Sequence, residues 1–94
     1  MSRRRTIEAI ERSLYVTISE LVQLTGMRYS TLKYYTEEGM IPFHQEESRL
    51  TRRYDRIASI KRIQEIKKLK DEGLTVSEIK RYLKHNEENK QGKT

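Results

Sequence analysis

The sequence predicts a mainly α-helical fold in which a pair of short helices, a two-stranded hairpin and a second helix pair follow one another. Apolar residues recur every three to four positions over most of the chain, as they do on the buried face of a helix. Residues 17–20 and 75–78 both read Thr-x-Ser-Glu, and a Thr followed three positions later by Glu is a capping box that begins a helix. Gly26, Gly39 and Gly73 follow the helical stretches and suit helix ends.

The first helix pair has the pattern of a helix-turn-helix. The capping box at 17–20 begins a helix that ends at Gly26, and a second helix over about 28–38 follows after a very short connection. Leu32 and Tyr35 point inward in this second helix. Its outward positions carry basic and aromatic residues, namely Arg28, Tyr29, Lys33 and Tyr34. Such a face is typical of a helix that enters the major groove of DNA, whereas ordinary solvated surface carries more Glu, Lys and Gln.

A basic hairpin is predicted after this pair. Pro42 ends any helix, residues 44–48 are polar and suit a loop, and residues 49–54 alternate like a half-buried strand. The hairpin would be a wing that carries arginines, and a plain basic loop is the alternative. The segment 49–70 holds nine basic and two acidic residues, a net charge of +7 against +6 for the whole chain. It follows the acidic residues Glu37, Glu38, Glu46 and Glu47, and this segregation suits a surface that faces a polyanion.

The remaining segments complete the core and the ends. Asp55 caps a long helix through about Glu72, and a last short helix follows the capping box at 75–78. The predicted inner residues are Ile57, Ile60, Ile63, Ile66 and Leu69 on the long helix, and Val76, Ile79, Tyr82 and Leu83 on the last one. The predicted organisation is a basic arm with a possible extra helix at 1–14, a folded domain at 15–83 and a flexible polar tail at 84–94.

Composition excludes several classes of function. The chain has 94 residues, enough for one domain, and 36% of them are charged. It has no cysteine, and its two histidines, His44 and His85, have no second ligand at metal-binding spacing. No residues have the type and spacing for nucleophilic or acid–base catalysis. We therefore predict a cytoplasmic protein that is not an enzyme, uses no cofactor or metal and does not enter a membrane.

Six blocks of the sequence resemble, in order, the DNA-binding domain of the MerR family. They are Thr17-Ile18-Ser19-Glu20-Leu21, Leu24-Thr25-Gly26, Ser30-Thr31-Leu32-Lys33-Tyr34-Tyr35, Glu38-Gly39-Met40-Ile41-Pro42, Arg52-Arg53-Tyr54 and Gly73-Leu74-Thr75-Val76-Ser77-Glu78-Ile79. The resemblance implies a winged helix-turn-helix with a second helix pair, and bacterial transcription regulation as the role.

Some positions depart from the pattern of the MerR family. Lys33 stands where the family has Arg in its Arg-Tyr-Tyr motif, and Arg28 replaces the small hydroxyl residue that caps the recognition helix. The long dimerising helix and effector domain of the family have no counterpart in the sequence, which indicates either a stand-alone form or the front module of a longer protein. No small-molecule effector is expected.

The residues and the resemblance together predict sequence-specific binding of double-stranded DNA, as a nucleoid-associated regulator at operator sites. The expected DNA contacts are Thr17, Arg28, Tyr29, Ser30, Lys33, Tyr34, Arg49, Arg52, Arg53 and Tyr54. Arginines of the wing and the tyrosines Tyr34 and Tyr54 would fix position on the backbone, while Arg28, Tyr29 and Lys33 would lie closest to base edges. An architectural DNA binder of the excisionase or plasmid-partition type and a protein-interaction module are the alternatives.

Self-association is also expected, because one small domain offers few contacts to select a site in a genome. The apolar residues Ile7, Ile10 and Leu14 could pack across a two-fold axis, or they could fold back onto their own domain. Alternatively, the acidic stretch could meet a basic face of the next copy head to tail. A weak dimer or cooperative assembly on DNA follows from either arrangement.

Overall fold

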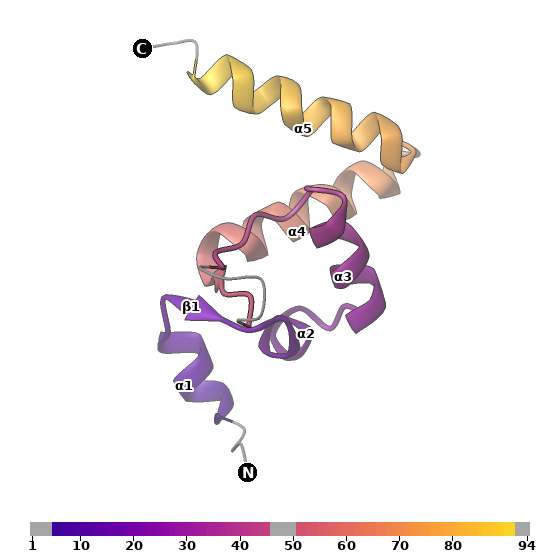
Figure 1. Cartoon of the computed structure of the whole chain (residues 1–94). Helices are drawn as coiled ribbons and strands as arrows, with labels where there is room; N and C mark the ends of the chain where they lie inside the picture. Colours follow the sequence, from indigo (N-terminus) through magenta and orange to yellow (C-terminus); the bar gives the residue numbers. More distant parts are fainter. Residues whose placement is uncertain (1–4, 46–50, 92–94) are drawn as a thin grey trace.

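Five α-helices and two short β-strands form the part of the chain that the computed structural model describes, residues 5–45 and 51–91 (Figure 1). The helices are α1 (Ile7–Arg12), α2 (Ile18–Thr25), α3 (Tyr29–Glu37), α4 (Arg56–Asp71) and α5 (Val76–Gln91), and the strands are β1 (Tyr15–Val16) and β2 (Tyr54–Asp55). The predicted fold class is confirmed, since α2 and α3 form a helix-turn-helix and α4 and α5 a second helix pair. No helix in the described ranges has the length and apolar character that crossing a membrane requires.

Local sequence sets where α2 and α5 begin. The Thr17 hydroxyl oxygen accepts a hydrogen bond from the Glu20 N–H at 3.2 Å, and the Glu20 carboxylate accepts one from the Thr17 N–H at 2.9 Å. Thr75 and Glu78 make the same reciprocal pair, at 3.2 and 2.8 Å. Each box satisfies two N–H groups that have no partner inside the helix. Both capping boxes predicted from the sequence are confirmed.

Helix ends and the start of α4 also follow the prediction. Gly26 ends α2 with φ +73°, a left-handed conformation that costs glycine little and strains other residues. Asp55 begins α4, because its carboxylate accepts a hydrogen bond from the Ala58 N–H at 2.9 Å. The turn between α2 and α3 is therefore short and defined.

The sheet differs from the predicted wing. Of the predicted hairpin, the described residues show one bridge, in which His44 and Arg53 exchange two backbone hydrogen bonds of 2.7 and 2.9 Å. Tyr54 and Asp55 then leave this bridge and pair antiparallel with Val16 and Tyr15. The two-stranded sheet therefore joins the segment before α2 to the segment before α4. The polar end of the predicted loop and Arg49 lie outside the described residues.

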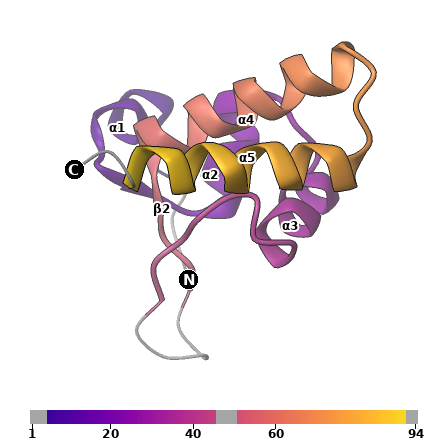
Figure 2. The same ribbon diagram turned by 90° about the horizontal axis from the view of Figure 1, so that it is seen from above.

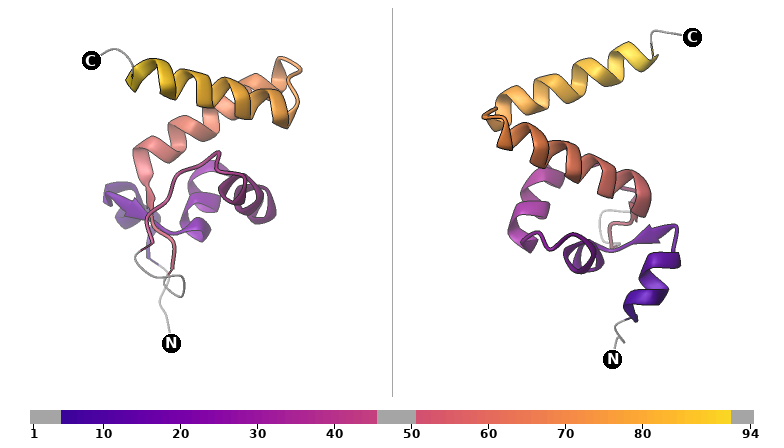
Figure 3. Two further views of the ribbon diagram at one scale, coloured as in Figure 1. Left: turned by 45° about the horizontal axis from the view of Figure 1, so that its top comes forward. Right: turned by 180° about the vertical axis from the view of Figure 1, so that it is seen from behind.

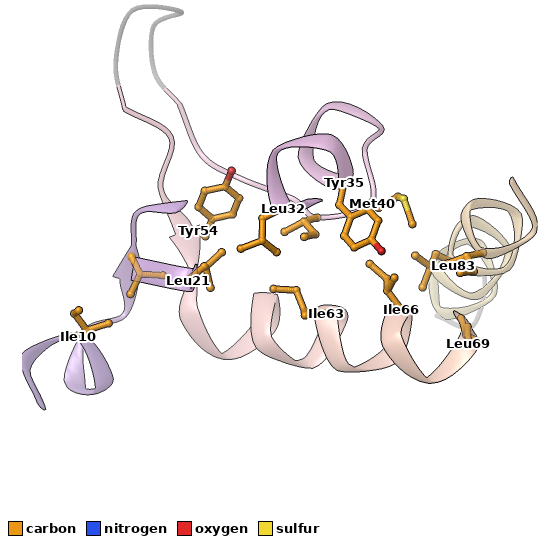
Figure 4. Close-up of a cluster of buried hydrophobic side chains, with 13 residues drawn as sticks. Ile10, Leu21, Leu32, Tyr35, Met40, Tyr54, Ile63, Ile66, Leu69 and Leu83 are labelled. Atoms are coloured by element: carbon orange, nitrogen blue, oxygen red, sulfur yellow. The ribbon is translucent and has the colours of Figure 1, made fainter. Parts of the chain in front are cut away.

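One apolar core runs along α4 (Figure 4). Ile63 and Ile66 of α4 lie beneath side chains from α3 and the segment that follows it, and Leu83 of α5 closes the far end beside Leu69. The same core takes in Leu21, Leu32, Tyr35, Met40 and Tyr54, all buried. This packing fixes the helix-turn-helix against the second helix pair. Helix α5 turns back from the end of α4 at a tight turn and diverges from it toward the C-terminus (Figures 1 and 2).

Two predicted inner residues are instead exposed. Ile57 is 58% exposed, and Ser59 is fully buried in its place. Each three-residue step falls about 60° short of a full helical turn, so Ile57 lies half a turn from Ile66, whereas Ser59 points nearly the same way as Ile66. Tyr82 is 44% exposed, because Ile79 and its neighbours already fill the inner face of α5. The predicted apolar stripes are therefore wrong at these two positions.

Helices form near both ends of the described chain, and the second of them is longer than predicted. The possible extra helix forms as α1, and Ile10 is fully buried against its own domain, while Ile7 and Leu14 remain 40% and 76% exposed. Helix α5 continues through Gln91 instead of ending near Leu83, since the added residues are mostly ones that tolerate helix well. Helices α1 and α5 lie at opposite ends of the molecule (Figure 3).

Candidate nucleic-acid interface

Helix α3 exposes the residues that the sequence predicts to face DNA. Leu32, Tyr35 and Thr36 are buried and fix the inner side of this helix. Its exposed residues are Arg28 and Tyr29 at the start of the helix, and Ser30, Lys33 and Tyr34 on the side away from the core. Tyr29 is 51% and Tyr34 45% exposed, so both rings are accessible at the surface of the helix. The structure thus gathers these five predicted residues on one helix.

Arg28 occupies the N-cap position of α3 and makes no capping hydrogen bond with its side chain. The departure at this position predicts that α3 has no side-chain cap, and the structure confirms this. The first N–H groups of α3 lack the partners that Thr17 and Glu20 supply at α2. The Arg28 side chain is exposed, which leaves its guanidinium at the amino end of the helix.

The base of the predicted wing lies next to α3. A hollow of about 310 Å³ separates them and is lined by Tyr29 and Lys33 of α3 and by Gln45, Thr51 and Arg52 of the hairpin segment. The Arg52 guanidinium lies over the Phe43 ring, 4.8 Å from its centre, in a cation–π contact. Figure 2 shows α3 and the ends of the hairpin segment on the same side of α4. The exposed side of α3 and this segment therefore form one continuous surface.

Arg53 is exposed beside the sheet, and its backbone is fixed by the bridge to His44. The His44 ring in turn meets the Tyr15 ring edge to face, with 5.6 Å between ring centres. These contacts hold the backbone at Arg53 while leaving its side chain in solvent.

Tyr54 corrects the predicted contact list. Its side chain is fully buried, and its hydroxyl lies 2.9 Å from the Thr36 hydroxyl, which also donates to the Leu32 carbonyl oxygen at 2.8 Å. Tyr54 therefore cannot touch a DNA backbone as predicted. It follows Arg53 in an extended segment whose side chains alternate, and the sequence pattern does not fix which of the two faces inward. Tyr54 instead ties α3 to the sheet.

Thr17 and the residues around it form a second part of the surface. The Thr17 side chain is half-buried, and its oxygen is used in the cap of α2. Thr17, Glu20 and Arg53 line a common hollow of about 270 Å³ together with Arg5. The amino end of α2 is thereby placed next to the segment that holds Arg53.

Arg5 is a residue of this site that sequence reasoning missed. Its Nε and Nη2 donate to the two Glu20 carboxylate oxygens at 2.8 and 2.7 Å, and its Nη1 donates to the Ser13 hydroxyl at 2.6 Å. These hydrogen bonds are the largest cause that lowers the pKa of Glu20, against the opposing effect of burial, and the Thr17 N–H adds to them. The partners are 15 positions apart, and no spacing rule in the sequence links them.

The far end of α3 is held by the second helix pair. Lys80 of α5 forms an ion pair with Glu38 at 2.7 Å, and Arg62 of α4 donates to the Met40 carbonyl oxygen at 2.8 Å. These contacts fix the turn after α3, so the exposed side of the helix keeps one orientation relative to the core. Glu38, part of the predicted acidic stretch, is thus engaged within its own chain.

Comparison with known proteins agrees with this arrangement. The model of the family described as MerR HTH family regulatory protein matches residues 16–86, from β1 into α5. The match leaves out α1 and Arg5. No curated protein and no solved structure matches the chain. The family match covers most of the chain and includes the helix-turn-helix formed by α2 and α3. This protein therefore belongs to the MerR helix-turn-helix family and is a DNA-binding transcription regulator.

Proposed function

We propose that the protein recognises a specific operator sequence by placing α3 in the major groove and the hairpin segment on the flanking backbone. The observation that carries this proposal is the continuous surface across the 310 Å³ hollow, where Tyr29 and Lys33 of α3 face Arg52. A helix of this exposure and chemistry can reach base edges, while the arginines beside it can neutralise phosphates. The protein acts by occupying DNA, without catalysis.

The residues divide into two roles in this proposal. Arg28 and Tyr29 stand at the amino end of α3, the part of a recognition helix that contacts bases. Lys33 offers a single point charge, which favours a phosphate over the two-bond recognition of guanine that Arg provides. The residues assigned to the DNA backbone are Thr17, Ser30, Tyr34, Arg49, Arg52 and Arg53.

The test compares single substitutions on a selected operator and on unrelated DNA. Neutralising about four to six phosphates per chain gives log K against log[salt] a slope of about −4 to −5. Arg52→Ala should weaken binding to both DNAs equally and reduce the slope by about one. Arg28→Ala should instead reduce the preference for the operator, by about 1–3 kcal/mol. Lys61→Ala, an exposed charge on α4 opposite the core, is the control and should change neither.

A flat salt response in the wild-type protein would rule out binding through phosphates. An unchanged preference in Arg28→Ala would show that α3 does not read the sequence. The selected DNA also separates a regulator from the architectural alternative, because a regulator protects one short site and an architectural protein protects an array of repeats.

We further propose that two copies meet through the end of the molecule formed by α1, β1 and the start of α4. Burial of Ile10 in its own core removes the central residue of the predicted two-fold contact, and the Glu38–Lys80 pair weakens the head-to-tail arrangement. Leu14 remains 76% exposed and lies next to α4, since its carbonyl oxygen accepts the Arg56 N–H at 2.9 Å. Ile57, the next residue of α4, is also exposed.

This end supports only weak pairing, because it offers few exposed apolar side chains, whereas a stable interface buries roughly 800 Å² per partner. The protein should sediment as a monomer or weak dimer and bind a two-site duplex cooperatively. Leu14→Asp should abolish the cooperativity and leave binding to a one-site duplex intact. A tight dimer without DNA would contradict the DNA-dependent assembly, and non-cooperative binding by the wild-type protein would contradict the pairing itself.

A further inference from the structure

The buried carboxylate of Glu20 lies in the part of the molecule where the wing meets α2. Glu20 is 8% exposed, and its oxygens accept from Arg5 and from the Thr17 N–H. It lines the same 270 Å³ hollow as Arg53. A negative charge here is unfavourable for a surface that approaches phosphates, so its neutralisation matters for DNA binding as well as for folding.

Arg5 neutralises this carboxylate with a fixed geometry. Its fork engages both oxygens of Glu20, and further donors reach the Ser13 hydroxyl at 2.6 Å and the Tyr15 carbonyl oxygen at 3.3 Å. Bidentate pairs of this kind are the strongest form of an Arg–carboxylate contact. Because its three nitrogens already donate within the protein, Arg5 has little capacity left to bind a phosphate directly.

We infer that Arg5 is a positioning residue for DNA binding, which occupies Glu20 so that Arg53 remains available to a DNA phosphate. Arg53 is the other arginine that lines the hollow, and its side chain is exposed. Without Arg5, the described guanidinium that shares the hollow with the Glu20 carboxylate is that of Arg53. The ion pair that would then form removes Arg53 from the wing surface. This inference rests on the proposed contact between Arg53 and DNA.

The segment before the family match thereby has a role of its own. Arg5, α1 and Ser13 all precede residue 16, where the match to the MerR family begins. Helix α1 is anchored by the buried Ile10, and Ser13 at its end receives the Arg5 guanidinium. The added helix therefore holds the arginine that adjusts the charge beside the wing.

The experiment is a mutant cycle measured by DNA binding across a salt series, with circular dichroism to confirm folding at the working temperature. Arg5→Ala should weaken binding about five- to tenfold and reduce the salt slope by about 0.9, the amount for one lost phosphate contact. Adding Glu20→Gln to Arg5→Ala should restore both, because Gln keeps the oxygen that accepts the Thr17 N–H but carries no charge. Arg12→Ala, which removes an exposed charge from the neighbouring helix α1, is the matched control and should leave the slope unchanged.

Arg53→Ala separates this role from a purely structural one. If Arg5 acts through Arg53, then Arg5→Ala has little further effect on binding once Arg53 is replaced. An undiminished effect in that background, or a failure of Glu20→Gln to restore binding, would overturn the inference. Should Arg5→Ala prove too unstable to measure, Glu20→Gln and Arg5→Ala/Glu20→Gln must bind DNA equally well. A wild-type protein that binds DNA without any contribution from Arg53 would instead disprove the proposed contact on which the inference rests.

Discussion

Helices α2 and α5 begin with nearly the same four residues. Their two capping boxes make the same hydrogen bonds but lie in different surroundings. Thr17 and Glu20 begin the first helix of the helix-turn-helix, and Thr75 and Glu78 begin the last helix of the chain. The two pairs of bonds agree within 0.1 Å. Local sequence alone therefore determines how each helix starts.

The surroundings decide what each carboxylate does beyond capping. Glu20 is buried and held by Arg5, in a hollow shared with Arg53, whereas Glu78 is exposed at the start of α5. The first box is thus part of the surface proposed to face DNA, and the second serves only its helix. A short motif can fix a helix end in two places and contribute to recognition in one of them.

The largest expected difference is in stability. Thr17→Ala should lower the free energy of unfolding by about 2 kcal/mol and Thr75→Ala by about 1 kcal/mol, the range observed for lost N-caps. The first loss is larger because Thr17 is half-buried and its partner Glu20 is held from a second side by Arg5. Urea unfolding of the two variants measures the difference. Equal losses would show that the surroundings of the box add nothing to its stability.

A second prediction concerns Tyr54, which ties α3 to the sheet. Tyr54→Phe should lower the free energy of unfolding by about 1 kcal/mol, because it removes the buried bond to Thr36 while the Thr36 hydroxyl keeps its bond to Leu32. DNA affinity should not change, since Tyr54 is fully buried. Tyr34→Phe is the matched control on the exposed side of α3 and should leave stability unchanged. Weaker DNA binding by a stably folded Tyr54→Phe would contradict this placement.

The contributions of the two carboxylates to the pH dependence of stability should also differ, but by less than the two caps differ in stability. The pKa of Glu20 is lowered mainly by its bonds to Arg5, and that of Glu78 mainly by the Thr75 N–H, both from an ordinary value of 4.5. A lowered pKa in the folded state means that the stabilisation is present above the unfolded-state pKa and is lost as pH falls through the folded one. Unfolding midpoints between pH 7 and pH 3 should therefore fall less in Glu20→Gln than in wild type. Glu78→Gln should reduce the fall of the midpoint by a smaller amount. The reverse order would contradict the stronger interaction of Glu20 with Arg5.

The smallest effect is expected where α5 meets the turn after α3. Lys80→Ala removes an exposed ion pair with Glu38, and pairs of this kind contribute little to stability in water. Its melting temperature should stay within the scatter of repeated wild-type measurements. A clear loss would mean that α5 supports the orientation of α3 more than its exposure implies.

Features set by neighbouring residues in the chain could be predicted from the sequence. Capping boxes, glycine stops and the exposed side of α3 depend on residues within one or two helical turns, so period and spacing were sufficient. Ile57 shows the limit of the same reasoning. Residues spaced three apart move progressively around an α-helix, so Ile57 points outward and Ser59 is buried instead. The DNA contacts assigned to the exposed residues stay predictions.

Features that join distant segments could not be predicted in this way. The pairing of β1 with β2 spans about 40 residues and involves two residues on each strand, too few for an alternating pattern to stand out. The same holds for Arg5 and Glu20, whose contact depends on how α1 docks through Ile10. Burial of Tyr54 follows from that pairing, which is why its predicted role was wrong.

The Arg52 guanidinium over the Phe43 ring has a thermodynamic consequence for the proposed complex. A free arginine side chain loses about 2 kcal/mol of rotamer entropy when it is immobilised. Folding already restricts Arg52 against the ring, and the edge of its planar fork can still donate hydrogen bonds. Phe43 then contributes to affinity without touching DNA, by reducing the entropy lost on binding. Calorimetry of Phe43→Leu should show this as a less favourable binding entropy with little change in enthalpy.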